Sequence, residues 1–162
     1  MGISVRTATK NDLPRILELE EQFDADAFDS AQFKRLFTPN RLFYILLENN
    51  NIIGYSIVNL RKNSKTAYLH SLCIDEKYHG KGYGRKFLEI LELESLKYSY
   101  TTMKLHVKVN KTSAIKLYTN MHYIKYDTVS KYYANGEDAY ERVFGTFHRL
   151  GEGYQNDTGE TK

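Results

Sequence analysis

Apolar residues occur along the chain in short alternating or continuous runs, separated by polar turns. Alternation with a period of two puts successive side chains on opposite faces of a strand, and short apolar runs are typical of buried strands. Asparagine tolerates the positive φ of a tight turn, so residues 49–51 are predicted to form a hairpin turn. We predict seven strands, over Ile3–Ala8, Leu42–Glu48, Ile52–Leu60, Ala67–Asp75, Thr101–Val109, Tyr123–Lys131 and Ala139–Phe147.

Four other segments carry apolar residues at helical spacing. They run from Asn11 or Asp12 to about Phe23, from about Ser30 to Phe37, over Gly82–Lys97, and over Thr112–Met121. The third has a broad apolar stripe made of Phe87, Leu88, Ile90, Leu91, Leu93 and Leu96. Strands and helices follow one another in mixed order, so we expect an α/β or α+β sheet protein.

Composition narrows the protein class. The 162 residues amount to one domain, which we place at 1–150, followed by a polar, flexible tail at 151–162. The net charge of +3 argues against a dedicated nucleic-acid binder. A single cysteine allows no internal disulfide, and neither a membrane-spanning run nor a signal peptide is evident. We therefore expect a soluble, cytoplasmic protein.

The densest local signal is a glycine-rich turn between a predicted strand and a predicted helix. Residues 75–86 read DEKYHGKGYGRK, with glycines at 80, 82 and 84. Glycines let backbone N–H groups approach a ligand closely, and a helix N-terminus favours an anion such as phosphate. The spacing matches neither a Walker P-loop nor a dinucleotide fingerprint. Spacing alone also leaves open a flexible turn with charged residues on it.

Together with its flanks, this segment resembles the acetyl-CoA loop of the GNAT superfamily of N-acetyltransferases. The family pattern is Gln/Arg-x-x-Gly-x-Gly/Ala, and His79 stands where Gln or Arg is usual. A second block, residues 105–118 (LHVKVNKTSAIKLY), is similar to the family's strand-helix segment. The family's Asn falls on Lys111, with Asn110 just before it, and the usual Gly-Phe after the helix is replaced by His122-Tyr123.

A third block, residues 131–140 (KYYANGEDAY), is similar to the closing hairpin of protein N-terminal acetyltransferases of the ribosomal-protein alanine and Nat catalytic-subunit types. In all, the resemblance covers about residues 3–147. It implies the GNAT fold, a twisted, mixed, mostly antiparallel sheet of about seven strands flanked by about four helices. It also implies acetyl-CoA as cosubstrate, no metal, and direct attack by an amine in a ternary complex.

The resemblance implies three catalytic residues: His106 as base, Tyr68 as its partner, and Tyr118 as acid for the CoA thiolate. His titrates in the working range of such a base. An α-amine has a pKa of about 7.7–8.0 and needs less help than a lysine amine at about 10.4. Each residue also has an ordinary structural interpretation: a solvated strand face for His106, strand packing for Tyr68, and helix core for Tyr118.

For the cosubstrate, the resemblance implies backbone contacts from Leu72, Cys73 and Ile74 to the pantetheine arm. The pyrophosphate would lie on His79, Gly80, Lys81, Gly82, Tyr83, Gly84 and Arg85, and Asn110, Lys111 and Tyr118 would complete the CoA site. Phe23, Phe28, Tyr132 and Tyr133 would line the slot for a peptide N-terminus.

We therefore expect an enzyme that acetylates protein N-termini. An auxiliary subunit or the ribosome remains open as a further partner, and neither nucleic acid nor membrane is expected to bind directly. The alternatives are acetylation of a small amine or a lysine, and a degenerate acyl-CoA-binding regulatory module, which the departures at His79, Lys111 and His122 favour.

Overall fold

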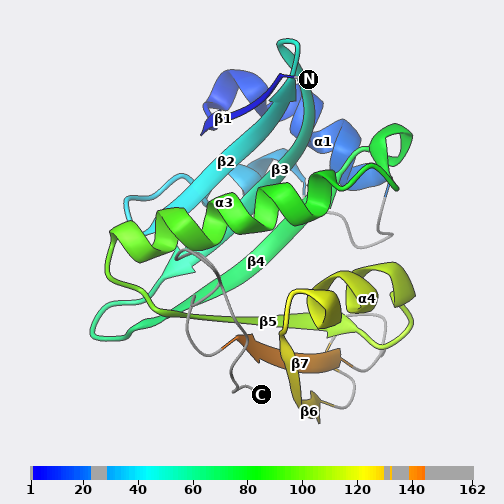
Figure 1. The fold of residues 1–162 in the computed structure, drawn as a ribbon. Coiled ribbons are helices and arrows are strands. Elements are labelled where there is room, and N and C mark those ends of the chain that lie inside the picture. Colours follow the sequence, from blue (N-terminus) through cyan, green and yellow to red (C-terminus); the bar gives the residue numbers. More distant parts are fainter. Residues whose placement is uncertain (1, 23–28, 130–131, 133–138, 145–162) are drawn as a thin grey trace.

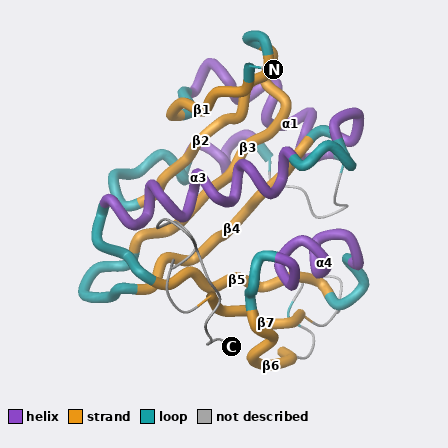
Figure 2. The backbone as a smooth tube through the Cα atoms, viewed as in Figure 1, coloured by secondary structure: helices purple, strands orange, loops and turns teal. Residues whose placement is uncertain are grey.

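A computed structural model describes residues 2–22, 29–129, 132 and 139–144. The described residues form a single seven-stranded sheet in the order β1-β2-β3-β4-β5-β7-β6 (Figures 1 and 2). The strands are β1 (Ile3–Thr7), β2 (Arg41–Glu48), β3 (Asn51–Leu60), β4 (Thr66–Ile74), β5 (Thr102–Lys108), β6 (Ile124–Val129) and β7 (Ala139–Phe144). All neighbouring strands are antiparallel except β4 and β5, so the predicted mixed, mostly antiparallel sheet is confirmed.

Helices cover both faces of the sheet. The described residues contain four α-helices, α1 (Leu13–Glu21), α2 (Ser30–Lys34), α3 (Tyr83–Lys97) and α4 (Thr112–Asn120), and two short 3-10 helices, η1 (Lys10–Asp12) and η2 (Glu76–Tyr78). One core cluster packs α1 and α2 against the sheet through residues such as Ile16, Phe33 and Tyr55. The other packs α3 and α4 on the opposite face through Phe87, Leu91 and Tyr118. In Figure 1, α3 lies in front of the sheet and α1 behind it.

Two local features show where the structure agrees with the sequence prediction and where it differs. Asn49 and Asn50 have φ of 51° and 70°, which confirms the predicted asparagine hairpin. In α3, Phe87, Leu88 and Leu91 are buried as predicted, but Leu93 and Leu96 are about 40% exposed. Positions 87, 88, 91, 92 and 95 share one helical face, so Glu92 and Ser95 are buried in their place.

The other predicted boundaries that fall on described residues agree to within about two residues, except that α2 ends at Lys34 rather than near Phe37. The predicted ends of the last two strands, Lys131 and Phe147, lie outside the described residues. The predicted turn at 135–136 and the tail at 151–162 lie outside the described residues. Among the residues that are described, no helix combines the length and the apolar character needed to cross a bilayer.

Gly54 holds β3 and β4 at a close approach. A Cβ on Gly54 would lie 2.6 Å from the carbonyl oxygen of Cys73 and 2.9 Å from the Ile74 side chain. We predict that Gly54→Ala lowers the free energy of unfolding by roughly 1–3 kcal/mol, because backbone must move to admit the methyl group. Urea denaturation measures the change.

Gly84→Ala is the matched control, since its Cβ would meet only Leu117 at an ordinary 3.5 Å and Ala suits a helix better than Gly. Equal stability of Gly54→Ala and the wild type would contradict the proposed crowding.

Candidate active site

The site begins where the pairing of β4 and β5 stops. These parallel strands pair only from Thr66–Thr102 to Leu69–Leu105, although β4 continues to Ile74 and β5 to Lys108. Beyond this point the two strands diverge, as Figure 1 shows. The register with β3 shifts at the same place, since Ile57 pairs with Ser71 and Val58 with Leu69. His70 is therefore an extra residue in β4, and such a bulge bends a strand and increases its twist.

Beyond Leu69, the β4 backbone groups that face β5 are no longer in its ladder, and this segment includes Leu72, Cys73 and Ile74, the three residues expected to contact pantetheine. Their side chains point elsewhere. Leu72 and Ile74 pack in the α3 core, whereas Cys73 packs with the α1 core. What this segment can offer a ligand is thus the backbone on the side that β5 no longer covers, where the Ile74 carbonyl already accepts from His79.

The glycine turn follows β4 directly and leads into α3. Gly80 and Gly82 have φ of 78° and 82°, a region that favours glycine, and a Cβ on either would meet no atom within 4 Å. Lys86 N–H is bonded to Gly82 C=O, so the helical bonding starts there. The preceding N–H groups at the start of α3 have no carbonyl within the helix to bind. The turn therefore forms an open backbone cradle at a helix N-terminus.

Side chains around this turn point away from the cradle or to its edge. The ring of His79 donates from Nε2 to the Ile74 carbonyl at 2.7 Å. The Lys81 ammonium lies 5.4 Å from the centre of the Tyr78 ring, and the Tyr83 hydroxyl donates to Glu48 on β2. Arg85 pairs with Glu89 one turn later in α3, at 3.5 Å. The cradle is thus made chiefly of main chain, with cations around it.

On the α1 side of the sheet, the structure brings Tyr68, His106 and Tyr132 together. The Tyr68 hydroxyl lies 2.7 Å from His106 Nδ1 and 3.3 Å from the Tyr132 hydroxyl. The Tyr132 ring stacks on the imidazole with centroids 4.3 Å apart and planes 11° apart. The guanidinium of Arg61 lies 5.7 Å from the centre of the Tyr68 ring. The face that alternation alone would leave to solvent is therefore covered by aromatic rings.

Tyr118 lies on the other face of the sheet. It is 8% exposed on α4, and its ring is 5.7 Å from that of Tyr123. Asn110 and Lys111 are exposed in the turn between β5 and α4, where Lys111 is the N-cap residue of the helix. Phe23, Phe28 and Tyr133 lie outside the described residues.

At the end of α4, His122 adopts φ 71°, the left-handed position that glycine usually takes after a helix. The Tyr123 N–H bonds the Tyr118 carbonyl at 2.9 Å, which closes the helix end. The departure from the family's glycine therefore leaves the local geometry in place.

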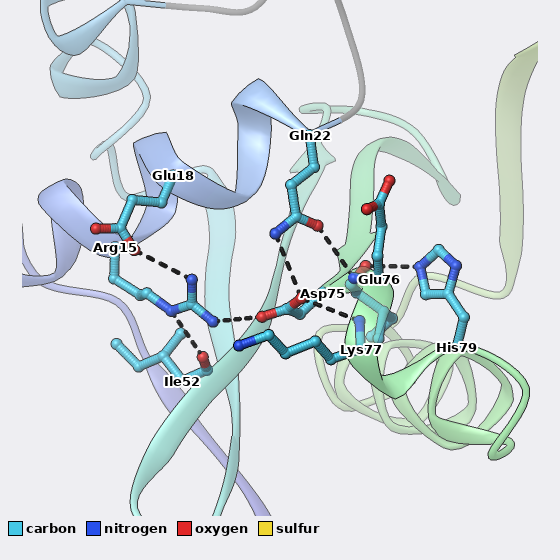
Figure 3. A network of polar contacts seen from close by, with 9 residues as sticks. Arg15, Glu18, Gln22, Ile52, Asp75, Glu76, Lys77 and His79 are labelled. Atoms are coloured by element: carbon cyan, nitrogen blue, oxygen red, sulfur yellow. Dashed lines mark hydrogen bonds and ion pairs between the residues drawn. The ribbon is translucent and has the colours of Figure 1, made fainter.

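Sequence reasoning missed a polar network that joins α1 to the start of the glycine turn (Figure 3). Arg15 Nη2 donates to the buried Asp75 carboxylate at 2.6 Å, and Gln22 Nε2 donates to it at 3.3 Å. These partners are 60 and 53 residues apart in the chain. Asp75 stood inside the glycine-rich segment, but periodicity and spacing contain no signal for its distant partners.

A second group missed from the sequence lies beneath α1. The fully buried Tyr55 hydroxyl donates to Glu20, and Cys73 Sγ is 4.0 Å from the same carboxylate oxygen. Burial, together with the neighbouring Cys73 and Glu20, raises the pKa of Tyr55 well above its ordinary value. Tyr55 therefore remains a neutral donor, and it ties α1 to the middle of the sheet.

Comparison with known proteins identifies the family and the fold. The profile of the acetyltransferase (GNAT) family matches residues 8–123. The chain belongs to this family. It is therefore an acyltransferase of the GNAT class, whose members use acetyl-CoA.

Two curated relatives cover most of this GNAT acetyltransferase. An N-alpha-acetyltransferase of Saccharolobus solfataricus is 25% identical over 150 residues, which are 85% of this chain and 89% of that protein. The N-alpha-acetyltransferase RimI of Mycobacterium tuberculosis is 28% identical over 145 residues, with the same two coverages of 85% and 89%. The chain spans 58% or less of the length of several other relatives that it matches.

Solved structures show the same fold. The ribosomal-protein-S18-alanine N-acetyltransferase of Escherichia coli superposes with a TM-score of 0.81 at 24% identity, over 90% of this chain and 94% of that one. A chain of the NatC complex bound to Gag peptide and CoA superposes with a TM-score of 0.76 at 19% identity, over 90% and 99%.

The residues around the gap fit the acetyl-CoA that the family uses. A pyrophosphate needs backbone donors with nothing in front of them, and Gly80 and Gly82 leave that space open. A pantetheine arm needs a strand edge that a neighbouring strand does not cover, and the β5 ladder along β4 ends at Leu69. Among the described residues, no cluster of three or more His, Cys, Asp or Glu side chains is placed to hold a metal ion.

Gly82→Ala tests the cradle. Alanine in the left-handed region is strained by roughly 1–2 kcal/mol, so we predict a less stable turn and about tenfold weaker binding of CoA in calorimetry. Asn63→Ala is the matched control, because Asn63 also has a positive φ, 57°, but lies in the turn before β4. CoA affinity lowered equally in both variants would contradict a specific role for the cradle.

Acid titration tests the two Asp–Arg pairs of the α1 region. Hydrogen bonds from Arg6 lower the pKa of Asp12. Burial alone would raise the pKa of Asp75, but the bonds from Arg15, the Lys77 N–H and Gln22 outweigh it and the net pKa is lowered. A lowered folded-state pKa stabilises the fold above the unfolded value of about 3.9, and this contribution is lost as pH falls below it.

We therefore predict that the free energy of unfolding, measured in urea, falls most steeply as the pH is lowered from about 4 through the lowered folded-state pKa values. The Asp12→Asn/Asp75→Asn double variant should show a shallower fall. An unchanged slope in that variant would contradict the assignment.

Proposed function

We propose that this protein transfers the acetyl group of acetyl-CoA to the free α-amino group of protein N-termini, by direct attack in a ternary complex. The observation that carries the proposal is the Tyr68–His106 pair beneath the Tyr132 ring, at the point where β4 and β5 separate. Two relatives that match 85% of the chain and bear the name N-alpha-acetyltransferase support the same acceptor.

The hydrogen-bond chain explains how His106 could act as a base. If His106 carries its proton on Nδ1, it donates to the Tyr68 oxygen, and the Tyr68 hydroxyl can donate onward to Tyr132. Nε2 then holds the lone pair that accepts a proton from the acceptor ammonium, directly or through a water. Stacking on Tyr132 fixes the plane of the imidazole, so the direction in which Nε2 points is set.

The weak base suits an α-amine. An amine with a pKa of about 7.7–8.0 is already partly neutral at physiological pH, whereas a lysine amine near 10.4 is almost fully charged. Acetyl-CoA supplies an acyl group activated as a thioester. The chain would hold it with the β4 backbone and the glycine turn, and positioning then provides much of the rate. Tyr118 is the proposed proton donor to the departing thiolate.

The proposal extends to setting and partners. A cytoplasmic location and recruitment by an auxiliary subunit or the ribosome are consistent with an enzyme that acts on new N-termini. The NatC structure that superposes on this chain is itself a chain of a complex. The direct partners that the proposal requires are only the peptide N-terminus and acetyl-CoA.

A peptide panel tests the acceptor. We expect acetylation of short peptides with a free α-amine, and little or none of N-blocked peptides that carry lysine, as measured by mass spectrometry with acetyl-CoA. Reaction of only the blocked peptides would replace the proposal by lysine acetylation. Reaction of only small amines would replace it by a metabolic activity, and CoA binding without turnover on any amine by an acyl-CoA-binding module.

Variants of the aromatic group test the mechanism. We predict that His106→Gln lowers kcat by roughly 10²–10⁴-fold near neutral pH, because the proton acceptor is lost. Tyr68→Phe should lower kcat less and shift its pH profile, because the Nδ1 partner is lost while Nε2 remains. His122→Gln and Tyr98→Phe are the matched controls, since His122 follows the C-cap of α4 and Tyr98 is the C-cap of α3. Full activity of His106→Gln across the pH range would remove His106 as the base.

A further inference from the structure

The start of the glycine turn is held by a buried carboxylate that receives donors from two sides (Figure 3). Asp75 is 3% exposed. It accepts from Arg15 and Gln22 on the α1 side and from the Lys77 N–H of the turn itself, at 2.6, 3.3 and 3.1 Å. A buried carboxylate that accepts from a guanidinium and from neutral donors holds the backbone of its own residue firmly, since charge-assisted hydrogen bonds are shorter and stronger than neutral ones.

Each of the two α1 residues makes two connections. Arg15 donates from Nε to the Ile52 carbonyl at 3.0 Å as well as to Asp75, so it fixes the turn relative to β3. Gln22 donates to Asp75 and accepts from the Glu76 N–H at 3.0 Å, so it holds two successive residues of the turn. Helix α1 and its C-cap residue thus hold the turn by hydrogen bonds to the first two turn residues, Asp75 and Glu76.

The far part of the turn has much less support. Gly80 and Gly82 have open space around their Cβ positions, and both have positive φ, which a flexible glycine can leave at little cost. The backbone of residues 80–82 therefore depends on its two ends, which are Asp75 and the His79–Ile74 bond on one side and α3, whose Tyr83 donates to Glu48, on the other. A small rotation at Asp75 would move the N–H groups of this backbone, and misplacement by about 1 Å can cost a large factor in rate.

We propose that Arg15, Gln22 and Asp75 are positioning residues for the acetyl-CoA pyrophosphate, and that helix α1 holds the glycine turn in the shape that binds it. The inference rests on the proposed role of this turn, but not on which amine is acetylated. The three residues do not touch the cosubstrate. They act through the backbone of residues 75–82, and their loss should affect the part of acetyl-CoA that the turn binds and spare the part that β4 binds.

Two acyl donors separate these parts. Acetyl-CoA carries the pyrophosphate, whereas S-acetylpantetheine has the same thioester and arm without it. We expect Asp75→Asn to weaken CoA binding by about tenfold or more in calorimetry, and to raise the KM for acetyl-CoA with kcat at saturation nearly unchanged. The KM for S-acetylpantetheine should stay within about twofold of the wild-type value, because that donor does not use the turn.

The chain offers a closely matched control. Asp12 is a buried carboxylate, 7% exposed, that accepts two hydrogen bonds of 3.0 Å from Arg6 and anchors the other end of the α1 region. Asp12→Asn should lose stability in the same way but keep the wild-type affinity for CoA. Gln22→Ala serves as the second test variant, because it removes the hydrogen bonds of Gln22 to the turn and leaves the Arg15–Asp75 ion pair intact.

Three outcomes are informative. Selective loss of CoA affinity in Asp75→Asn and Gln22→Ala, but not in Asp12→Asn, supports the inference. Wild-type CoA affinity in folded Gln22→Ala and Asp75→Asn, or equal weakening of both acyl donors, overturns it. If the wild type itself binds CoA no better than pantetheine, the turn does not bind the pyrophosphate, and the failure lies in the proposed role of the turn.

Discussion

The site depends on one constraint in the sheet, the end of β4–β5 pairing at Leu69 and Leu105. A parallel pair that continued to Ile74 would satisfy the backbone groups of β4 and leave nothing to bind a ligand. The extra residue at His70 bends β4 just where its partner is lost. The open strand edge and the turn that follows β4 lie around this fork between β4 and β5 (Figure 1). The Tyr68–His106 pair joins the two strands next to it.

The fork also divides the proposed work between the two faces of the sheet. On one face, α3 presents its N-terminus and the glycine turn, and α4 carries the buried Tyr118. On the other, His106 and its two tyrosines face the side that α1 covers. In the proposed mechanism, the thioester lies where β4 and β5 diverge, so that it is held from one face and the amine approaches from the other. Helix α1 lies on the face proposed for the amine, and through the Arg15–Asp75 bond it holds the turn that is proposed to bind acetyl-CoA.

Local features could be predicted from the sequence because their causes are local. Alternation predicts the strands and the shared face of Lys104, His106 and Lys108, and the three asparagines predict their own turn. The pairing of Tyr68 with His106 was expected from the family resemblance, whereas the contacts of both residues with Tyr132 were not. The bulge at His70 has no sequence pattern, since it arises from strand register. The Arg15–Asp75 pair joins residues 60 apart, and only the folded chain brings them together. For the same reason, the side-chain directions of His79 and Tyr83 could not be predicted.

The most direct measurement is hydrogen–deuterium exchange of the whole chain with and without CoA. We predict that CoA slows amide exchange at two places, residues 71–74 of β4 and the turn at residues 80–85, and changes exchange little in β1 and β2. These two segments hold the backbone groups that the fork leaves for the ligand. Protection elsewhere, or no protection of the β4 segment when CoA is bound, would contradict the claim that the fork between β4 and β5 is the cosubstrate site.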